Sequence, residues 1–232
     1  MKVEIWSDVM CPFCYIGKRK FEQALVEFAH RDEVLVTWKS FQLAPDMQTE
    51  QDKTIDQYLA EHKGIPLAQA REMNAHVTQL AKKVGLTYNF DKAVVANSFD
   101  AHRFSHLAKQ HGLQDIAEER LFAAYFTEGK NTADHDTLIQ LGTDIGLDAT
   151  ETRNMLNSNL FAEEVRGDIR EAQQIGASGV PFFVFVHKYA ISGAQDSSTF
   201  LQALNQVWEE TGHDALPLAE NDGASCTPDG CS

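Results

Sequence analysis

The sequence has few cysteines, few positive charges and no long apolar run. Its 232 residues include 4 cysteines, and 34 Asp and Glu residues outnumber 20 Lys and Arg residues. The formal net charge of −14 argues against binding to nucleic acid or to an anionic membrane surface, because both attract positive charge. No stretch approaches the roughly 20 apolar residues of a membrane span. The first residues, MKVEIWSDV, lack the apolar core of a secretory signal. These absences predict a cytoplasmic protein without nucleic-acid or membrane partners.

What remains is the composition of an ordinary globular protein. Hydrophobic residues make up 43% of the chain and charged residues 23%, and a chain of this length can bury a core without disulfides. In a reducing compartment, cysteines are more often catalytic, redox-sensing or metal-binding than structural. The four cysteines form two pairs, Cys11 with Cys14 and Cys226 with Cys231.

The hydrophobic pattern predicts strands only near the two ends of the chain. We expect strands over 2–7 and 33–43, with a helix between them that ends near residue 30. Five or six helices should follow, and then two short strands within 181–192 and a last helix over 197–212. The sequence therefore predicts an α/β fold whose core, residues 1–53 and 175–212, is interrupted by an all-helical insertion. The insertion spans 54–174, and a flexible acidic tail spans 213–232.

The motif CPFC lies where the first predicted strand meets the first predicted helix. With Cys11 as the N-cap, Pro12 is the first helical residue and Cys14 is one turn further along. Unpaired backbone N–H groups at a helix start favour a thiolate, and such sites lower a cysteine pKa from about 8.5 to between about 3.5 and 7.5. We therefore predict a lowered pKa for Cys11, with Cys11 as the nucleophile and Cys14 as the resolving thiol.

Two other interpretations of CPFC remain open at this point. The two cysteines could be small core residues, or they could form half of a zinc site completed by Cys226 and Cys231. The segment GVPFFVF favours the redox interpretation, because Val180-Pro181 comes directly before an apolar strand. Taken alone, this proline could simply mark the start of a strand.

Several segments together resemble one protein family. They are SDVMCPFCYIGK (7–18), NSFDAHRFSHLA (97–108), LFAAYFTEGKN (121–131), GVPFFVF (179–185) and ISGAQ (191–195). The chain resembles the DsbA-like branch of the thioredoxin superfamily, and within it the FrnE-like cytosolic oxidoreductases. This resemblance implies a thioredoxin fold with a helical insertion and a thiol-disulfide oxidoreductase or isomerase without a cofactor. It also implies a cis Val180-Pro181 bond that binds substrate backbone beside Cys11.

The dipeptide between the cysteines departs from the strongly oxidising members of the branch, which carry Pro-His. Phe13 can give the Cys11 thiolate neither a hydrogen bond nor a positive charge. We therefore expect a less oxidising potential than the roughly −120 mV of DsbA, which favours reduction or reshuffling of disulfides. The expected partners are protein or peptide disulfides and cellular thiols. A glutathione-dependent kappa-type transferase or isomerase is the alternative, although that branch usually has serine in place of Cys11.

The second cysteine pair lies in CTPDGC near the end of the chain. Pro-Asp-Gly favours a turn that brings Cys226 and Cys231 together, and some FrnE-like proteins carry a similar pair. We expect a second redox pair that exchanges with Cys11 and Cys14. An exposed disulfide without function is the alternative.

A few further residues are candidates for the site. By the same resemblance Asn97, His102 and Arg103 could line the cleft over Cys11, although structural hydrogen bonds between insertion and core are favoured. Asp8 is either a solvated loop charge or a proton acceptor. His102 and His106 lack a third ligand at a suitable spacing, so we expect no metal site.

Overall fold

The computed structural model describes residues 1–50, 52–211, 226–227 and 230–231. Most of the acidic tail predicted over 213–232 lies outside these residues. The flexibility expected of that tail therefore stays a prediction. No helix among the described residues is long and apolar enough to cross a membrane.

The core strands and helices lie close to their predicted positions. Near the N-terminus they are β1 (Lys2–Ser7), α1 (Pro12–Glu27), a short 3-10 turn (Arg31–Glu33) and β2 (Leu35–Ser40). Near the C-terminus they are β3 (Phe182–Phe185), β4 (Tyr189–Ser192) and α9 (Ser197–Thr211). A two-stranded ribbon follows, made of β5 (Cys226–Thr227) and β6 (Gly230–Cys231).

These strands form the mixed sheet of a thioredoxin fold, as predicted. The order is β2-β1-β3-β4, with β1 parallel to β2 and antiparallel to β3. Ile5 at the centre of β1 pairs with Trp38 on one side and with Phe183 on the other. The central strands β1 and β3 are both buried, which explains the continuous apolar run FFVF of β3.

In the described part of the chain, seven α-helices lie between β2 and β3 and form the inserted part, rather than the five or six predicted. They are α2 (Ile55–Lys63), α3 (Leu67–Lys83), α4 (Phe99–Gln110), α5 (Gln114–Phe122), α6 (His135–Asp144), α7 (Ala149–Leu156) and α8 (Ala162–Gln174). A π-helical segment, Ala123–Glu128, continues α5 without a break. The sequence pattern missed these divisions because several of the helices are only eight to ten residues long.

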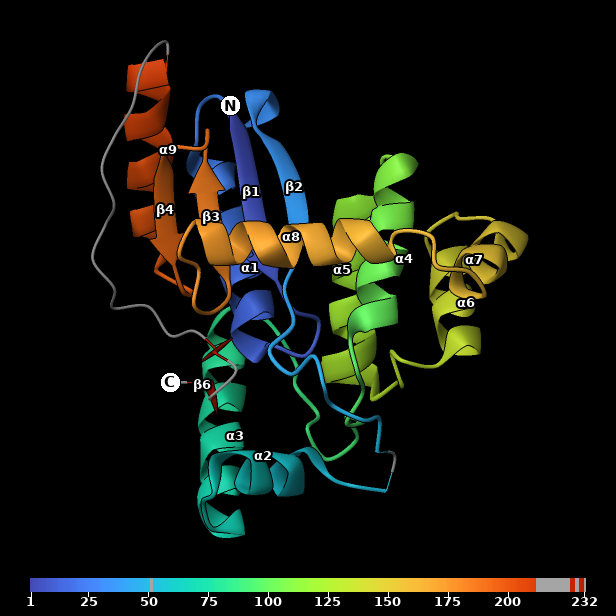
Figure 1. Ribbon diagram of the computed structural model, residues 1–232. Helices are drawn as coiled ribbons and strands as arrows, with labels where there is room; N and C mark the ends of the chain where they lie inside the picture. The colour runs from blue at the N-terminus through green and yellow to red at the C-terminus, as the bar shows by residue number, and fades with distance from the viewer. Residues whose placement is uncertain (51, 212–225, 228–229, 232) are drawn as a thin grey trace.

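Helices cover both faces of the sheet (Figure 1). On one face, Phe21 of α1 packs against Phe183 of β3 and Phe200 of α9, with ring centroids 5.5 and 5.6 Å apart. On the other face α8 crosses the sheet, and the indole N–H of Trp6 donates to the backbone oxygen of Asp168 at 2.9 Å. The alternation of β1 therefore sends neighbouring residues to two different helical layers.

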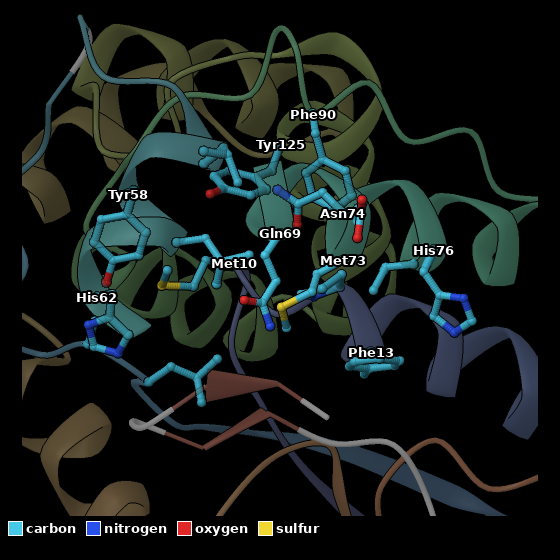
Figure 2. A pocket seen from close by; sticks show the side chains of 17 residues that line it. Met10, Phe13, Tyr58, His62, Gln69, Met73, Asn74, His76, Phe90 and Tyr125 are labelled. Atoms are coloured by element: carbon cyan, nitrogen blue, oxygen red, sulfur yellow. The ribbon is translucent and has the colours of Figure 1, made fainter. Parts of the chain in front are cut away.

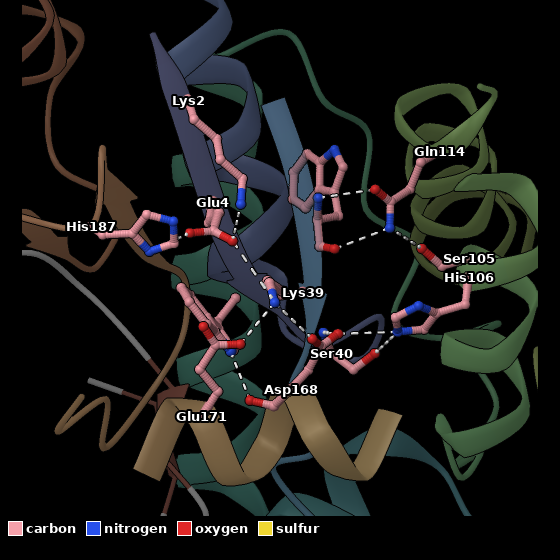
Figure 3. Close-up of polar contacts among 12 residues, drawn as sticks. Lys2, Glu4, Lys39, Ser40, Ser105, His106, Gln114, Asp168, Glu171 and His187 are labelled. Atoms are coloured by element: carbon pink, nitrogen blue, oxygen red, sulfur yellow. Dashed lines mark hydrogen bonds and ion pairs between the residues drawn. The ribbon is translucent and has the colours of Figure 1, made fainter. Parts of the chain in front are cut away.

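A polar network fastens α8 to the edge of the sheet (Figure 3). Lys39 Nζ on β2 donates to Asp168 at 3.0 Å and to Glu171 at 2.8 Å. The second oxygen of Asp168 accepts from the Ser40 backbone N–H at 3.0 Å and lies 3.0 Å from His106 Nε2. Asp168 thus joins α8, β2 and α4 in one buried cluster.

Asp168 predicts a pH-dependent contribution to stability. Burial acts to raise the pKa of Asp168, but His106, the Ser40 N–H and Lys39 outweigh it and lower that pKa below its ordinary value. Asp168→Ala should lower the free energy of unfolding by about 3 kcal/mol at neutral pH, because it leaves the partners of a buried pair unmatched. The contribution is complete above the unfolded pKa of about 3.9 and is lost as the pH falls through the lower folded pKa.

Denaturant unfolding between neutral pH and about pH 2 measures this effect, and the difference between wild type and variant should shrink toward the acid end. Asp136→Ala is the matched control, because Asp136 is exposed and its ion pair with Arg153, at 3.4 Å, is on the surface. An equal, small effect of both substitutions would contradict the account.

Candidate functional site

The two cysteines of CPFC occupy the start of α1. Cys11 is the N-cap in an extended conformation, with φ −85° and ψ 112°, and Pro12 is in the first helical turn. The Cys14 backbone N–H donates to the Cys11 carbonyl oxygen at 3.1 Å. The predicted capping arrangement is therefore confirmed.

The Val180-Pro181 bond is cis and lies beside Cys11. The Cys11 thiol donates to the Val180 carbonyl oxygen, with Sγ and oxygen 3.5 Å apart. Helix α1 approaches the same loop closely at Gly17, where an added Cβ would lie 2.9 Å from Pro181 Cγ. Two motifs 169 residues apart in the sequence thus meet at one sulfur atom.

Burial works against ionisation of Cys11. The Cys11 side chain is fully buried and Cys14 nearly so. Desolvation, together with the neighbouring Cys14 thiol and the Asp8 charge, raises the pKa of Cys11 well above its ordinary value, and the Cys14 backbone N–H only partly opposes this. The predicted lowering of the pKa is therefore wrong for this packed arrangement. The reason is that loss of water outweighs what the helix start supplies.

Aromatic residues of the insertion hold α1 in place. The Tyr88 hydroxyl donates to the Pro12 carbonyl oxygen at 2.6 Å. Tyr88 stacks on Phe126 of the π-helical segment, and Phe122 stacks on Tyr15, with centroids 4.6 and 4.9 Å apart. Sequence reasoning missed Tyr88, because no motif spacing connects it with CPFC.

An apolar cavity of about 450 Å³ opens beside CPFC, between the core and helices α2 and α3. Figure 2 shows side chains from both parts of the chain around it, with Phe13 at its edge. Its lining includes Met10, Phe13, Tyr58, Met73, Phe90 and Tyr125. Tyr125 reaches the cavity from the π-helical segment, a type of helix that occurs often at functional sites.

Two of the three further candidates form structural hydrogen bonds. The Asn97 side-chain amide donates to the backbone oxygens of Pro45 and Met47, at 3.2 and 2.9 Å. The Arg103 guanidinium donates to the backbone oxygens of Met155, in the last turn of α7, and of Ser158, just after α7, both at 2.5 Å. Among the described residues, these contacts join Asn97 and Arg103 to loops of the fold rather than to Cys11.

His102 lies next to Asp8, which precedes Cys11 by three residues. His102 Nε2 is 3.4 Å from Asp8 Oδ1, and both side chains are buried. The interpretation of Asp8 as a solvated loop charge is therefore wrong. Each residue was a separate candidate in the sequence, but the contact between the two depends on packing of α4 against the loop after β1.

The backbones of Cys226 and Cys231 are register partners in the β5–β6 ribbon, and β6 lies beside α2. Their side chains lie outside what the structure describes. Among the described residues, no group of three or more His, Cys, Asp or Glu side chains is arranged to hold a metal ion.

Comparison with known proteins identifies the family. The model of the DSBA-like thioredoxin domain matches residues 2–205. This chain belongs to that family. It is 39% identical to a Streptomyces coelicolor protein described as a "probable DsbA oxidoreductase", with a TM-score of 0.85 and coverage of 100% of this chain and 98% of the other.

Two further relatives are more distant. The uncharacterized protein YwbO of Bacillus subtilis is 26% identical over 208 residues, which cover 88% of this chain and 95% of YwbO. The cytosolic disulfide reductase DsbM of Pseudomonas aeruginosa, solved with glutathione, is 18% identical with a TM-score of 0.61. That alignment covers 89% of this chain and 95% of DsbM, and at this identity it shows a shared fold only.

The contact of Gly17 with Pro181 predicts that this family member cannot accept a side chain there. Gly17→Ala should lower the free energy of unfolding by about 1–2 kcal/mol, because the added methyl group overlaps a rigid ring. Gly167→Ala on α8 is the matched control, since its nearest neighbour would be Arg170 at 3.9 Å. The control should gain up to about 1 kcal/mol from helix propensity. Denaturant unfolding measures both, and equal gains would contradict close packing at Gly17.

Proposed function

We propose that this chain is a thiol-disulfide oxidoreductase that reduces or isomerises disulfides in proteins or peptides through Cys11 and Cys14. The observation that carries the proposal is the meeting of Cys11, at the start of α1, with the cis Val180-Pro181 loop in a chain of this family. Burial alone would also suit two small core cysteines. Core packing, however, gives no reason for both cysteines to lie in the first turn of a helix beside that loop.

The chemistry requires two exchange steps. The Cys11 thiolate attacks one sulfur of the substrate disulfide, which forms a mixed disulfide and releases the first substrate thiolate. The Cys14 thiolate then attacks Cys11 Sγ, which releases the second substrate thiolate, and both released thiolates take up protons. The substrate gains two electrons, and Cys11 and Cys14 become a disulfide. An isomerase cycle ends instead when a substrate thiol attacks the mixed disulfide.

The apolar cavity supports a peptide or protein substrate. It begins at Met10 and Phe13, so a side chain near the substrate cysteine can enter it while the disulfide reaches Cys11. A second cavity continues from the shared residues Leu43 and Tyr58 toward Ala177. We propose that backbone near the substrate disulfide pairs with Val180-Pro181 beside Cys11.

The buried thiols favour the reducing direction. DsbA is a strong oxidant because its reduced form is stabilised. In this chain Phe13 offers the Cys11 thiolate no hydrogen bond, and burial raises the Cys11 pKa, so the reduced form lacks that stabilisation. We propose a cytoplasmic reductase or isomerase of the FrnE-like subgroup, without a bound cofactor. It would be regenerated by cellular thiols such as glutathione, the compound present in the DsbM structure.

The insulin-reduction assay tests this proposal. Wild type should accelerate reduction by a small thiol, and Cys11→Ser should abolish the acceleration because no nucleophile remains. Cys14→Ser should accumulate mixed disulfides with substrate, since the resolving step is missing. Mass spectrometry of trapped species provides the second readout. Full activity of Cys11→Ser would reject the proposal.

The second cysteine pair gives a finer proposal. The backbone pairing of Cys226 with Cys231, and the position of β6 beside the cavity helix α2, support a relay between the tail and CPFC. Replacing both tail cysteines by serine should then slow insulin reduction while Cys11 keeps its alkylation rate. Unchanged reduction by this variant would remove the relay and leave the role of Cys11 and Cys14 intact.

A further inference from the structure

A buried pair of side chains, Asp8 and His102, lies beside the CPFC motif. The Asp8 carboxylate is fully buried and accepts the Leu43 backbone N–H at 2.7 Å and the Met10 backbone N–H at 3.4 Å. His102 Nε2 lies 3.4 Å from Asp8 Oδ1, the oxygen that accepts from Met10. His102 Nε2 has no hydrogen-bond partner within the described part of the chain, so Asp8 is its polar neighbour.

Asp8 is also coupled to the reactive sulfur. The Cys11 backbone N–H donates to the Asp8 carbonyl oxygen at 3.0 Å, so the two residues share one tight turn. Burial is the largest cause of the raised pKa of Cys11, and the charge of Asp8 adds to it. An unpaired carboxylate at this position would therefore oppose the negative thiolate that disulfide exchange requires.

We propose that His102 is a positioning residue that pairs with Asp8 and neutralises its charge, so that Cys11 can carry the negative charge of a thiolate during exchange. This inference rests on the proposed function of Cys11. The inserted helix α4 then has a role in the reaction, because its His102 imidazole lies beside the loop after β1. His102 acts through Asp8 and needs no contact with the substrate.

The other groups around the pair are consistent with a protonated His102. Burial acts to lower the pKa of His102, but Asp8, the Glu118 charge on α5 and the Phe41 backbone raise it overall. Burial, and then the Asp8 charge, raise the pKa of Tyr58 in α2 and of Tyr125 in the π-helical segment. Both tyrosines therefore stay neutral at neutral pH. One Glu118 oxygen accepts from Ser105 at 2.6 Å, and burial raises the pKa of this carboxyl. Among the described residues around Asp8, His102 is therefore the group that can carry a positive charge.

The pH profile of Cys11 alkylation tests the inference in a Cys14→Ser background, where only one thiol of the motif titrates. The midpoint of the profile is the readout, because it reports the pKa of Cys11 rather than the overall rate of alkylation. His102→Gln should move the midpoint upward and slow alkylation near neutral pH by about tenfold, the effect of one pKa unit. Asp8→Asn should move it downward, because the opposing charge is gone.

The double variant separates electrostatics from structure. If His102 acts through Asp8, adding His102→Gln to Asp8→Asn should leave the midpoint of Asp8→Asn unchanged. His106→Gln is the matched control, because His106 is a buried histidine one turn along α4 that pairs with Asp168 instead of Asp8. Its midpoint should equal that of the background protein. If His102→Gln fails to fold by circular dichroism, His102→Asn replaces it in the same cycle.

Overlapping profiles for His102→Gln and the background would overturn the inference. An equal shift by His102→Gln with and without Asp8 would also overturn it. The proposed function fails in a different way, since insulin reduction would then not depend on Cys11, whatever the alkylation profiles show. The two proposals can therefore be rejected separately.

Discussion

The competition between desolvation and helix-start stabilisation at Cys11 governs the chemistry of this fold. The start of α1 provides a backbone N–H that favours a thiolate, while complete burial disfavours any charge on the sulfur. In the packed structure burial wins, and the thiol donates to the Val180 carbonyl oxygen. Under the proposed function, a pair of thiols held in this way gives electrons more readily than it accepts them, because the reduced form gains little from ionisation.

The inserted helices act on that balance from several directions. Tyr88 fixes the first turn of α1, α2 and α3 form the wall of the apolar cavity, and α4 brings His102 to Asp8. The insertion also depends on the core, since Asp168 of α8 is bound to Lys39 and Ser40 of β2. Core and insertion therefore share buried polar contacts. We expect a substitution in either part to change the packing around Cys11 and Cys14.

The fold and the two central motifs could be predicted because residues close together in the sequence indicate them. Alternation marked β1, and Cys11-Pro12 marked the start of α1 through the chemistry of helix caps. Contacts across the chain were harder to predict. The Asp8–His102 pair, the Tyr88 hydrogen bond and the net effect of burial on Cys11 all arise from packing between segments. The local sequence indicates where a helix begins and so where its dipole favours a thiolate. The burial of the Cys11 sulfur, however, depends on how the core and the insertion pack around it.

The redox potential of the Cys11-Cys14 pair, measured by equilibration with glutathione, tests the central claim most directly. If desolvation dominates at Cys11, the potential should lie nearer to the roughly −270 mV of thioredoxin than to the roughly −120 mV of DsbA. Little thiolate absorbance should then be present at neutral pH. A potential at or above the DsbA value, with a thiolate formed below about pH 7, would contradict the account.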